Sequence, residues 1–214
     1  ETALSKEWKK TMLILLDKAK NFPSIEGFYK KMQEREDWEV LLMPIPYFTR
    51  KGSGEFSEEF IDTEAFPKEY SYVDYKSFAF DTVLPDCIVM NSPYDSCNMV
   101  YSIDPFFYSE NMKKYTKNLF YIPWFVTGEI IWGAEEDEKA VVIMDYYACQ
   151  PGLAHADHSF VQSEEIRKSY IEKLTAFAGE ESREQWEKKI VAAGSCLRGQ
   201  SEELAKQVLA CMEE

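Results

Sequence analysis

The sequence predicts an α/β protein: a Rossmann-like, three-layer domain with a mostly parallel sheet of roughly five or six strands. Short apolar runs of strand length alternate with segments of helical periodicity, the order that produces βαβ units. The apolar runs are nearly continuous, which is typical of strands buried on both faces. The 214 residues are enough for one such domain with a substantial core, so residues 1–214 are interpreted as a single domain.

The first part of the chain contains two predicted strands, at residues 12–16 and 39–44. Between them, residues 23–33 form an amphipathic helix that begins with proline, a residue favoured at the first helical position. Residues 49–75 have no sustained periodicity and carry glycines and many acidic residues, so we predict a long loop excursion of the kind that is often functional. A short helix within 75–83 is expected to follow.

Two more buried strands are expected in the middle of the chain, at 87–90 and 118–125. The helix between them is predicted to have Ser109 as its N-cap and Glu110 in its first turn, where an acidic side chain is favourable. The polar residues 91–95 directly follow the first of these strands. Ligands of parallel α/β sheets bind at the carboxyl ends of the strands, so we expect the functional residues along this rim.

The segment before the last two strands is harder to assign. Residues 128–138 are polar and acidic, and the apolar residues 140–147 fit either a strand or a helix. We favour a helix, because Pro151 and Gly152 would end it.

The remaining elements are local and regular. We predict a strand at 158–163, helices at 163–179 and 182–190, a small strand at 191–195 and a terminal amphipathic helix in 201–214. The terminal helix could also serve as the interface of a homodimer.

Composition excludes several classes of function. The net charge is −14 and the acidic residues are scattered, which opposes unaided binding to nucleic acid. Five cysteines without a CxxC pair suggest neither a disulfide framework nor a zinc site, and no cofactor is predicted. No apolar run approaches ~18 residues and no signal peptide is present, so a cytoplasmic protein without a membrane span is expected. The chain begins at Glu1 without methionine, as a fragment would.

The candidate site residues lie mostly at predicted strand ends. His155 is the candidate catalytic residue, and the candidate ligand-binding residues are Asn91, Ser92, Tyr94, Asp95, Ser109, Gln162 and Ser163. Asp95 fits the orientation of a sugar or glycerol hydroxyl, and it equally fits a turn cap. Ser163 stands where a helix N-terminus could bind phosphate, although simple capping is the more economical interpretation.

Histidine is suited to general-base chemistry because its side chain ordinarily titrates near neutral pH. His155 could act in this way on a hydroxyl, or it could be a loop histidine satisfied by backbone groups. His155 and His158 with Asp157 between them can also be drawn as a metal site, but the spacing indicates no third ligand, so no metal is predicted. Walker, GxGxxG, HExxH and GxSxG motifs are absent, which removes the signals for the enzyme classes that they mark.

Several segments together resemble the N-terminal half of CDP-glycerol glycerophosphotransferase-like proteins, members of the teichoic-acid polymerase superfamily of Gram-positive bacteria. The resemblance extends over about residues 12–195, and its motifs lie at 84–95, 104–109, 121–125, 155–157 and 161–164. It implies a GT-B architecture, in which two Rossmann-like domains face each other across a cleft.

The resemblance implies an acceptor-side domain for the synthesis of a teichoic-acid-type cell-wall polymer. The implied acceptor is a glycerol phosphate or polyol phosphate. CDP-glycerol would bind only with a second domain, so the domain alone would be inactive. The resemblance also implies peripheral contact with the inner face of the plasma membrane. One departure stands out: members carry a His-Gly motif after a central strand, and residues 121–128 contain no histidine. The alternative is therefore a non-catalytic ligand- or protein-binding module that keeps the Rossmann-like fold.

Overall fold

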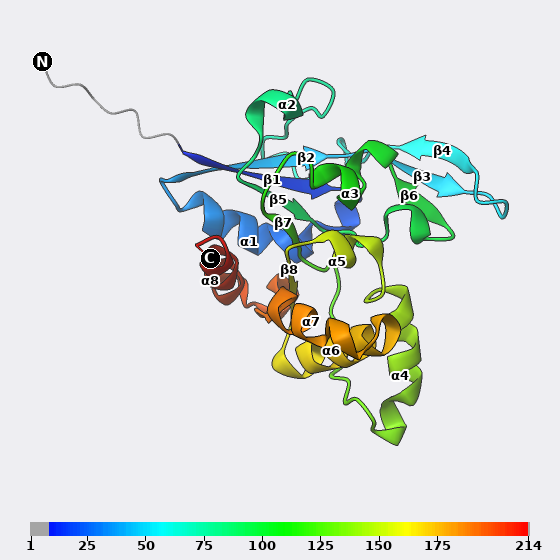
Figure 1. The fold of residues 1–214 in the computed structure, drawn as a ribbon. Helices are drawn as coiled ribbons and strands as arrows, with labels where there is room; N and C mark the ends of the chain where they lie inside the picture. Colours follow the sequence, from blue (N-terminus) through cyan, green and yellow to red (C-terminus); the bar gives the residue numbers. More distant parts are fainter. Residues whose placement is uncertain (1–8, 214) are drawn as a thin grey trace, which may run out of the picture.

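A six-stranded parallel sheet forms the centre of the computed structural model, which describes residues 9–213 (Figure 1). Its strand order is β2-β1-β5-β7-β8-β9, and every neighbouring pair is parallel. The strands are β1 (Lys10–Leu16), β2 (Trp38–Pro44), β5 (Cys87–Met90), β7 (Leu119–Tyr121), β8 (His158–Val161) and β9 (Ile190–Ala192). This sheet confirms the predicted α/β class.

Continuous apolar strands are explained by helices on both faces of the sheet. In β1, Leu13 and Leu15 face one core, whereas Met12 and Ile14 face the other, and all four side chains are buried. Because alternate side chains point to opposite faces, both sets must be apolar.

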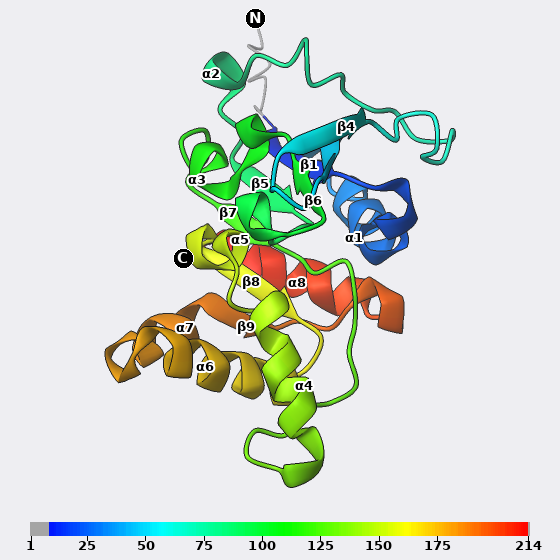
Figure 2. The ribbon, with the colours of Figure 1, turned by 90° about the vertical axis from the view of Figure 1, so that its right-hand side faces the viewer.

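Helices α1 and α3 lie on opposite sides of the central strands (Figure 2). The core on the first face includes residues of α1 (Pro23–Gln33) and α8 (Ser201–Cys211). The core on the second face includes residues of α3 (Ser109–Met112), α5 (Pro151–His155), α6 (Glu164–Ala178) and α7 (Arg183–Lys189). The apolar side chains Leu204 and Val208 of α8 are fully buried in the first core, so this face of the terminal helix is already covered within the chain.

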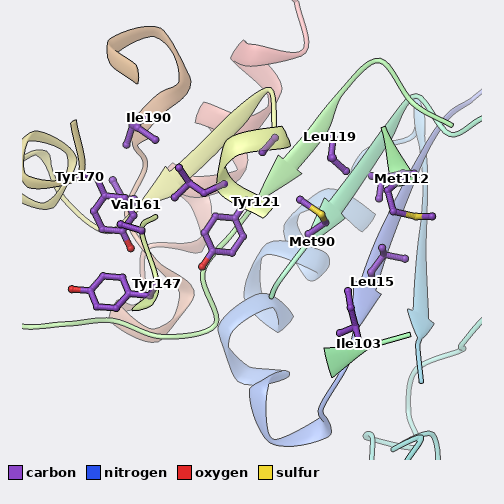
Figure 3. Packing of buried hydrophobic residues seen from close by; sticks show 14 of the residues in the cluster. Leu15, Met90, Ile103, Met112, Leu119, Tyr121, Tyr147, Val161, Tyr170 and Ile190 are labelled. Carbon is purple, nitrogen blue, oxygen red and sulfur yellow. The ribbon is translucent and has the colours of Figure 1, made fainter. Parts of the chain in front are cut away.

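Three tyrosines lie together in the second core, beside the last two strands of the sheet (Figure 3). Tyr121 of β7 and Tyr170 of α6 are buried together with Tyr147, next to Val161 and Ile190 of the two last strands. The rings of Tyr147 and Tyr170 have centroids 5.9 Å apart. The hydroxyl of Tyr121 is buried without a hydrogen-bond partner.

The segment 49–75, predicted as a long loop, is a loop over most of its length but also contains one whole strand and the end of another. Strands β3 (Tyr47–Arg50), β4 (Phe56–Phe60) and β6 (Tyr101–Ile103) form an antiparallel sheet in the order β4-β3-β6. Cross-strand aromatic pairs stabilise it: the rings of Phe48 and Phe56 stack at 4.8 Å, and those of Tyr47 and Phe60 at 5.4 Å. β4 is largely exposed, so it lacks the apolar pattern by which a buried strand is recognised.

The ambiguous stretch 140–147 is helical, as predicted: α4 (Glu138–Ile143) continues into a 3₁₀ turn over Met144–Tyr146. The role predicted for Pro151 was wrong, because it begins α5 instead of ending a helix. α2 (Phe80–Val83) is the short helix predicted before β5. No helix formed by residues 9–213 is long and apolar enough to cross a membrane.

The predicted start of α3 is displaced by one residue. Tyr108 holds the N-cap position, and Ser109 is the first helical residue. The reason is a contact from outside the helix, because the Ser109 N–H donates to the Asp95 carboxylate at 3.0 Å. A distant acidic side chain thus takes the place of the local cap.

Candidate functional site

Polar side chains are buried where β1 and β5 end. Asp17 follows β1, and Asn91 and Ser92 follow β5. These strands are parallel neighbours in the sheet, so their carboxyl ends meet at one edge. The exposed fractions of the three residues are 2%, 2% and 6%, in the order named. Polar residues are rarely buried to this extent without hydrogen-bond partners.

Tyr101 of β6 joins the two strand ends. Its hydroxyl lies 2.8 Å from Ser92 Oγ and donates to Asp17 Oδ2 at 3.3 Å. The other carboxylate oxygen, Asp17 Oδ1, accepts the Lys18 N–H at 2.8 Å. The Tyr94 ring meets the Tyr101 ring edge-on, with centroids 5.9 Å apart. The small antiparallel sheet therefore supplies a side chain to the rim of the large one.

Asn91 fixes the neighbouring elements. Its Nδ2 donates to the Ile122 carbonyl oxygen at 2.9 Å and to Ser24 Oγ at 3.2 Å. Ile122 directly follows β7, and Ser24 lies in the first turn of α1. Asn91 thus connects the carboxyl ends of β5 and β7 with the start of α1.

The rim also carries a cation. Lys18 Nζ lies 3.6 Å from the centroid of the Tyr101 ring and 5.1 Å from that of Tyr47, within the range of cation–π contacts. Burial raises the pKa of the Asp17 carboxyl, and hydrogen bonds to it act in the opposite direction. Burial lowers the pKa of Lys18, opposed by the charge of Asp17. Two adjacent residues thus bring a carboxyl group and an amine to this edge of the sheet, the amine lying against the Tyr101 ring.

A small cavity of about 10 Å³ lies beneath this rim, lined by Asp17, Asn91 and Ser92 together with apolar side chains. Space of this size holds about one water molecule. Its three polar residues are the kind of partners that an ordered water or a ligand hydroxyl requires.

Three other predicted residues come into contact with one another. The Ser109 hydroxyl donates to Asp95 Oδ2, and Ser109 Oγ lies 2.7 Å from His155 Nδ1. Asp95 and Ser109 are buried, whereas His155 is exposed. His155 is the last residue of α5, so it reaches this cluster from the helical layer and does not join Asn91 at the carboxyl rim. The prediction of one common rim was wrong in this respect.

Asp95 has a strained backbone. Its φ is +45°, a left-handed conformation that non-glycine residues rarely adopt, and Leu84 is the other non-glycine example within residues 9–213. Its Oδ1 atom is buried without a hydrogen-bond partner. Burial raises the pKa of the Asp95 carboxyl, and the bonds from Ser109 oppose this rise. Asp95 caps α3, and it also supports the position of His155 through Ser109.

Gln162 and Ser163 lie after β8 and hold a loop in place. The Gln162 side chain accepts the Thr127 N–H and donates to the Thr127 carbonyl oxygen, both at 2.8 Å. Ser163 is the N-cap of α6, as the capping interpretation predicted, and its hydroxyl also donates to Glu129 at 2.6 Å. Arg198 contacts the same carboxylate at 2.9 Å. Phosphate binding at this position stays a prediction.

Sequence reasoning missed Asp17, Lys18 and Tyr101. Asp17 and Lys18 had a signal, because they follow the first apolar run as directly as Asn91 follows the third. Tyr101 had none, because β6 belongs to a different sheet. Within residues 9–213, no three His, Cys, Asp or Glu side chains are arranged to hold a metal ion.

No protein-family model and no curated protein matches this chain. Among solved structures it is similar to a UDP-GlcNAc 2-epimerase from Neisseria meningitidis bound to UDP-GlcNAc, with 8% identity, a TM-score of 0.40 and coverage of 86% of this chain and 46% of that one. It is also similar to a UDP-N-acetylglucosamine 2-epimerase from Rickettsia bellii, with 10% identity, a TM-score of 0.37 and coverage of 94% of this chain and 49% of that one. A third similar structure is an S. aureus MnaA–UDP co-structure, with 8% identity, a TM-score of 0.44 and coverage of 91% of this chain and 46% of that one.

The chain thus spans about half the length of these proteins. At such TM-scores the likeness carries no argument about function, which must come from the site itself.

Proposed function

We propose that this chain is the acceptor-side domain of a CDP-glycerol glycerophosphotransferase-like enzyme, and that it binds a polyol phosphate above the carboxyl ends of β1 and β5. The supporting observation is the buried network that joins Asp17, Tyr101 and Ser92, with the Lys18 ammonium group beside it. Carboxylate and hydroxyl groups bind the hydroxyls of a polyol, and an ammonium group binds its phosphate.

In this proposal Asp17 is the general base. The acceptor hydroxyl attacks the phosphorus of CDP-glycerol, a new P–O bond forms, and the bond to CMP breaks. The proton of the attacking hydroxyl passes to Asp17, because burial raises the pKa of this carboxyl and so makes it a stronger base than an exposed aspartate. CDP-glycerol would be held by a second domain, because positioning donor against acceptor supplies much of the rate. The reaction would take place in the cytoplasm, at the inner face of the plasma membrane.

The second candidate function is a non-catalytic ligand- or protein-binding module. The small cavity favours it, because about 10 Å³ does not admit a polyol unless Tyr101 or Lys18 moves. The position of His155 also favours a binding module. The sequence suggested His155 as the general base, and this residue does not lie with Asp17 and Asn91 at the carboxyl ends of β1 and β5.

Calorimetric titration with glycerol 3-phosphate, CMP and CDP-glycerol tests the proposal. Glycerol 3-phosphate should bind, and Lys18→Met should weaken its binding at least about tenfold by removing the ammonium group. Lys20→Met is the matched control, since it removes the same charge from an exposed position two residues away and should leave binding unchanged.

Three outcomes would contradict the proposal. The first is the absence of glycerol 3-phosphate binding by a folded sample, which would favour the binding-module alternative. The second is equal weakening by Lys18→Met and Lys20→Met, which would indicate attraction by general surface charge instead of a site. Binding of CMP alone would also oppose an acceptor-side role.

A further inference from the structure

A second polar pocket, of about 320 Å³, lies at the amino ends of β8 and β9. It is lined by His155, Ala156, Asp157, His158, Gln185, Lys188 and Lys189. These residues come directly before or at the start of the two strands, whereas Asp17 and Asn91 follow theirs. The pocket therefore shares no residue with the carboxyl rim.

Hydrogen bonds fix the orientation of His155 in this pocket. The Ser109 hydroxyl gives its one proton to Asp95, so Ser109 Oγ has only lone pairs to offer to His155 Nδ1 at 2.7 Å. With Asp95 ionised, this arrangement places a proton on Nδ1 of the imidazole, which donates to Ser109. The other ring nitrogen, Nε2, remains to contact a ligand. Ser109 is fully buried and acts as a positioning residue.

The pocket carries positive charge. Lys189 is 8% exposed, and its amine donates to the Ala154 carbonyl oxygen at 2.5 Å. Lys188 forms a surface ion pair with Glu184, and its side chain is 74% exposed, so its amine can turn to a ligand. The carboxylate of Asp157 is neutralised by Lys113 and accepts the Leu119 N–H at 2.8 Å. Two lysines thus line the pocket in a protein of net charge −14, and the pocket's one carboxylate is already paired with Lys113.

We propose that this pocket binds the phosphate group of a small phosphomonoester, with its oxygens at the amines of Lys188 and Lys189 and one oxygen at His155 Nε2. The volume fits a phosphate with a short alcohol, since about 300 Å³ is the lower limit for small-molecule sites. This inference does not rest on the proposed function.

The protonation chemistry agrees with this ligand class. A phosphomonoester loses its second proton near pH ~6, and an imidazole ordinarily titrates near ~6.5, so one proton is easily shared between them. Burial lowers the pKa of Lys189 to about 8, and a bound dianion next to the amine opposes that effect.

Titration of the whole chain with inorganic phosphate, followed by ¹⁵N NMR of the imidazoles, tests the proposal. The chain has two histidines, so a His155→Gln sample assigns the signals. Free protein should show His155 protonated on Nδ1, and added phosphate should shift the Nε2 signal. Ser109→Ala should give a mixture of tautomers and weaken phosphate binding several-fold, an effect that a merely structural serine would not produce.

Lysine variants separate the site from general electrostatic attraction. Lys189→Met should weaken phosphate binding at least about tenfold. If that variant does not fold, Lys188→Met replaces it, because Lys188 is largely exposed. Lys117→Met removes an exposed lysine that lines a different pocket, so it should have no effect. An unchanged His155 signal on phosphate addition, or equal weakening by Lys117→Met, would overturn the proposal.

Discussion

Replacing Gly152 with alanine is predicted to destabilise the protein by about 1–3 kcal/mol. Gly152 is the second residue of α5, and its N–H donates to the Pro93 carbonyl oxygen at 2.8 Å. A Cβ atom at this position would lie 2.8 Å from Pro93 Cα and 2.9 Å from Pro93 O. Both are backbone atoms that no side-chain rotation can remove. The helix and the loop after β5 must therefore move apart.

The magnitude follows from three effects. Overpacking a filled interior costs about 1–3 kcal/mol, and loss of the hydrogen bond to Pro93 costs about 0.5–1.5 kcal/mol. Alanine regains at most about 1 kcal/mol of helix propensity over glycine. The net loss is about 1–3 kcal/mol, which lowers the melting temperature of a chain of this size by about 2–12 °C.

Thermal and urea unfolding followed by circular dichroism measure this effect. Gly52→Ala is the matched control, because a Cβ there meets no atom within 4 Å and neither glycine has a positive φ. The control should stay within about 0.5 kcal/mol of the natural sequence. Equal stability of the Gly152→Ala variant and the natural sequence would refute the close packing of α5 on the Pro93 backbone.

Three further predictions concern buried polar groups. Tyr121→Phe should leave the free energy of unfolding unchanged or raise it by up to about 2 kcal/mol, because the Tyr121 hydroxyl is buried without a hydrogen-bond partner. A clearly lower free energy of unfolding, measured with urea, would contradict this. Burial lowers the pKa of Lys189 from 10.5 to about 8, so the unfolded chain binds more protons between these pH values and stability rises with pH there. Lys189→Met should abolish this rise in urea unfolding, whereas Lys206→Met, at an exposed position, should retain it. Gln162→Leu removes two hydrogen bonds to the Thr127 backbone. It should speed proteolytic cleavage near Thr127 more than it lowers global stability. An unchanged cleavage rate would argue that these two bonds do not hold the loop in place.

Predictions that rest on local patterns agree well with the structure. The helix predicted at 23–33 has the same bounds as α1, and the apolar runs at 12–16 and 87–90 lie in β1 and β5. Apolar periodicity and continuous apolar runs are read directly along the chain, because the core selects side chains within each element. The exposed strand β4 was missed for the same reason, since it contributes little to the core.

The sequence predicted several residues of the candidate site, but it did not predict which of them contact one another. Asp95, Ser109 and His155 were each singled out, yet the sequence gives no sign that they touch. Ser109 lies 14 residues from Asp95 and 46 from His155, so only the packing of α3 against α5 brings them together. Gln162 and Ser163 were also singled out, and their main observed contacts hold a loop and cap α6.

The sequence by itself determined the α/β class, the positions of most buried strands and helices, and the polar turn after β5. These features depend on side-chain pattern and turn chemistry within short segments. Only the tertiary structure decided that Tyr101 reaches Asp17 across 84 residues and that His155 faces a pocket at the opposite ends of the strands. Such contacts depend on strand order and on the antiparallel sheet, and no local pattern encodes which distant segments will become neighbours.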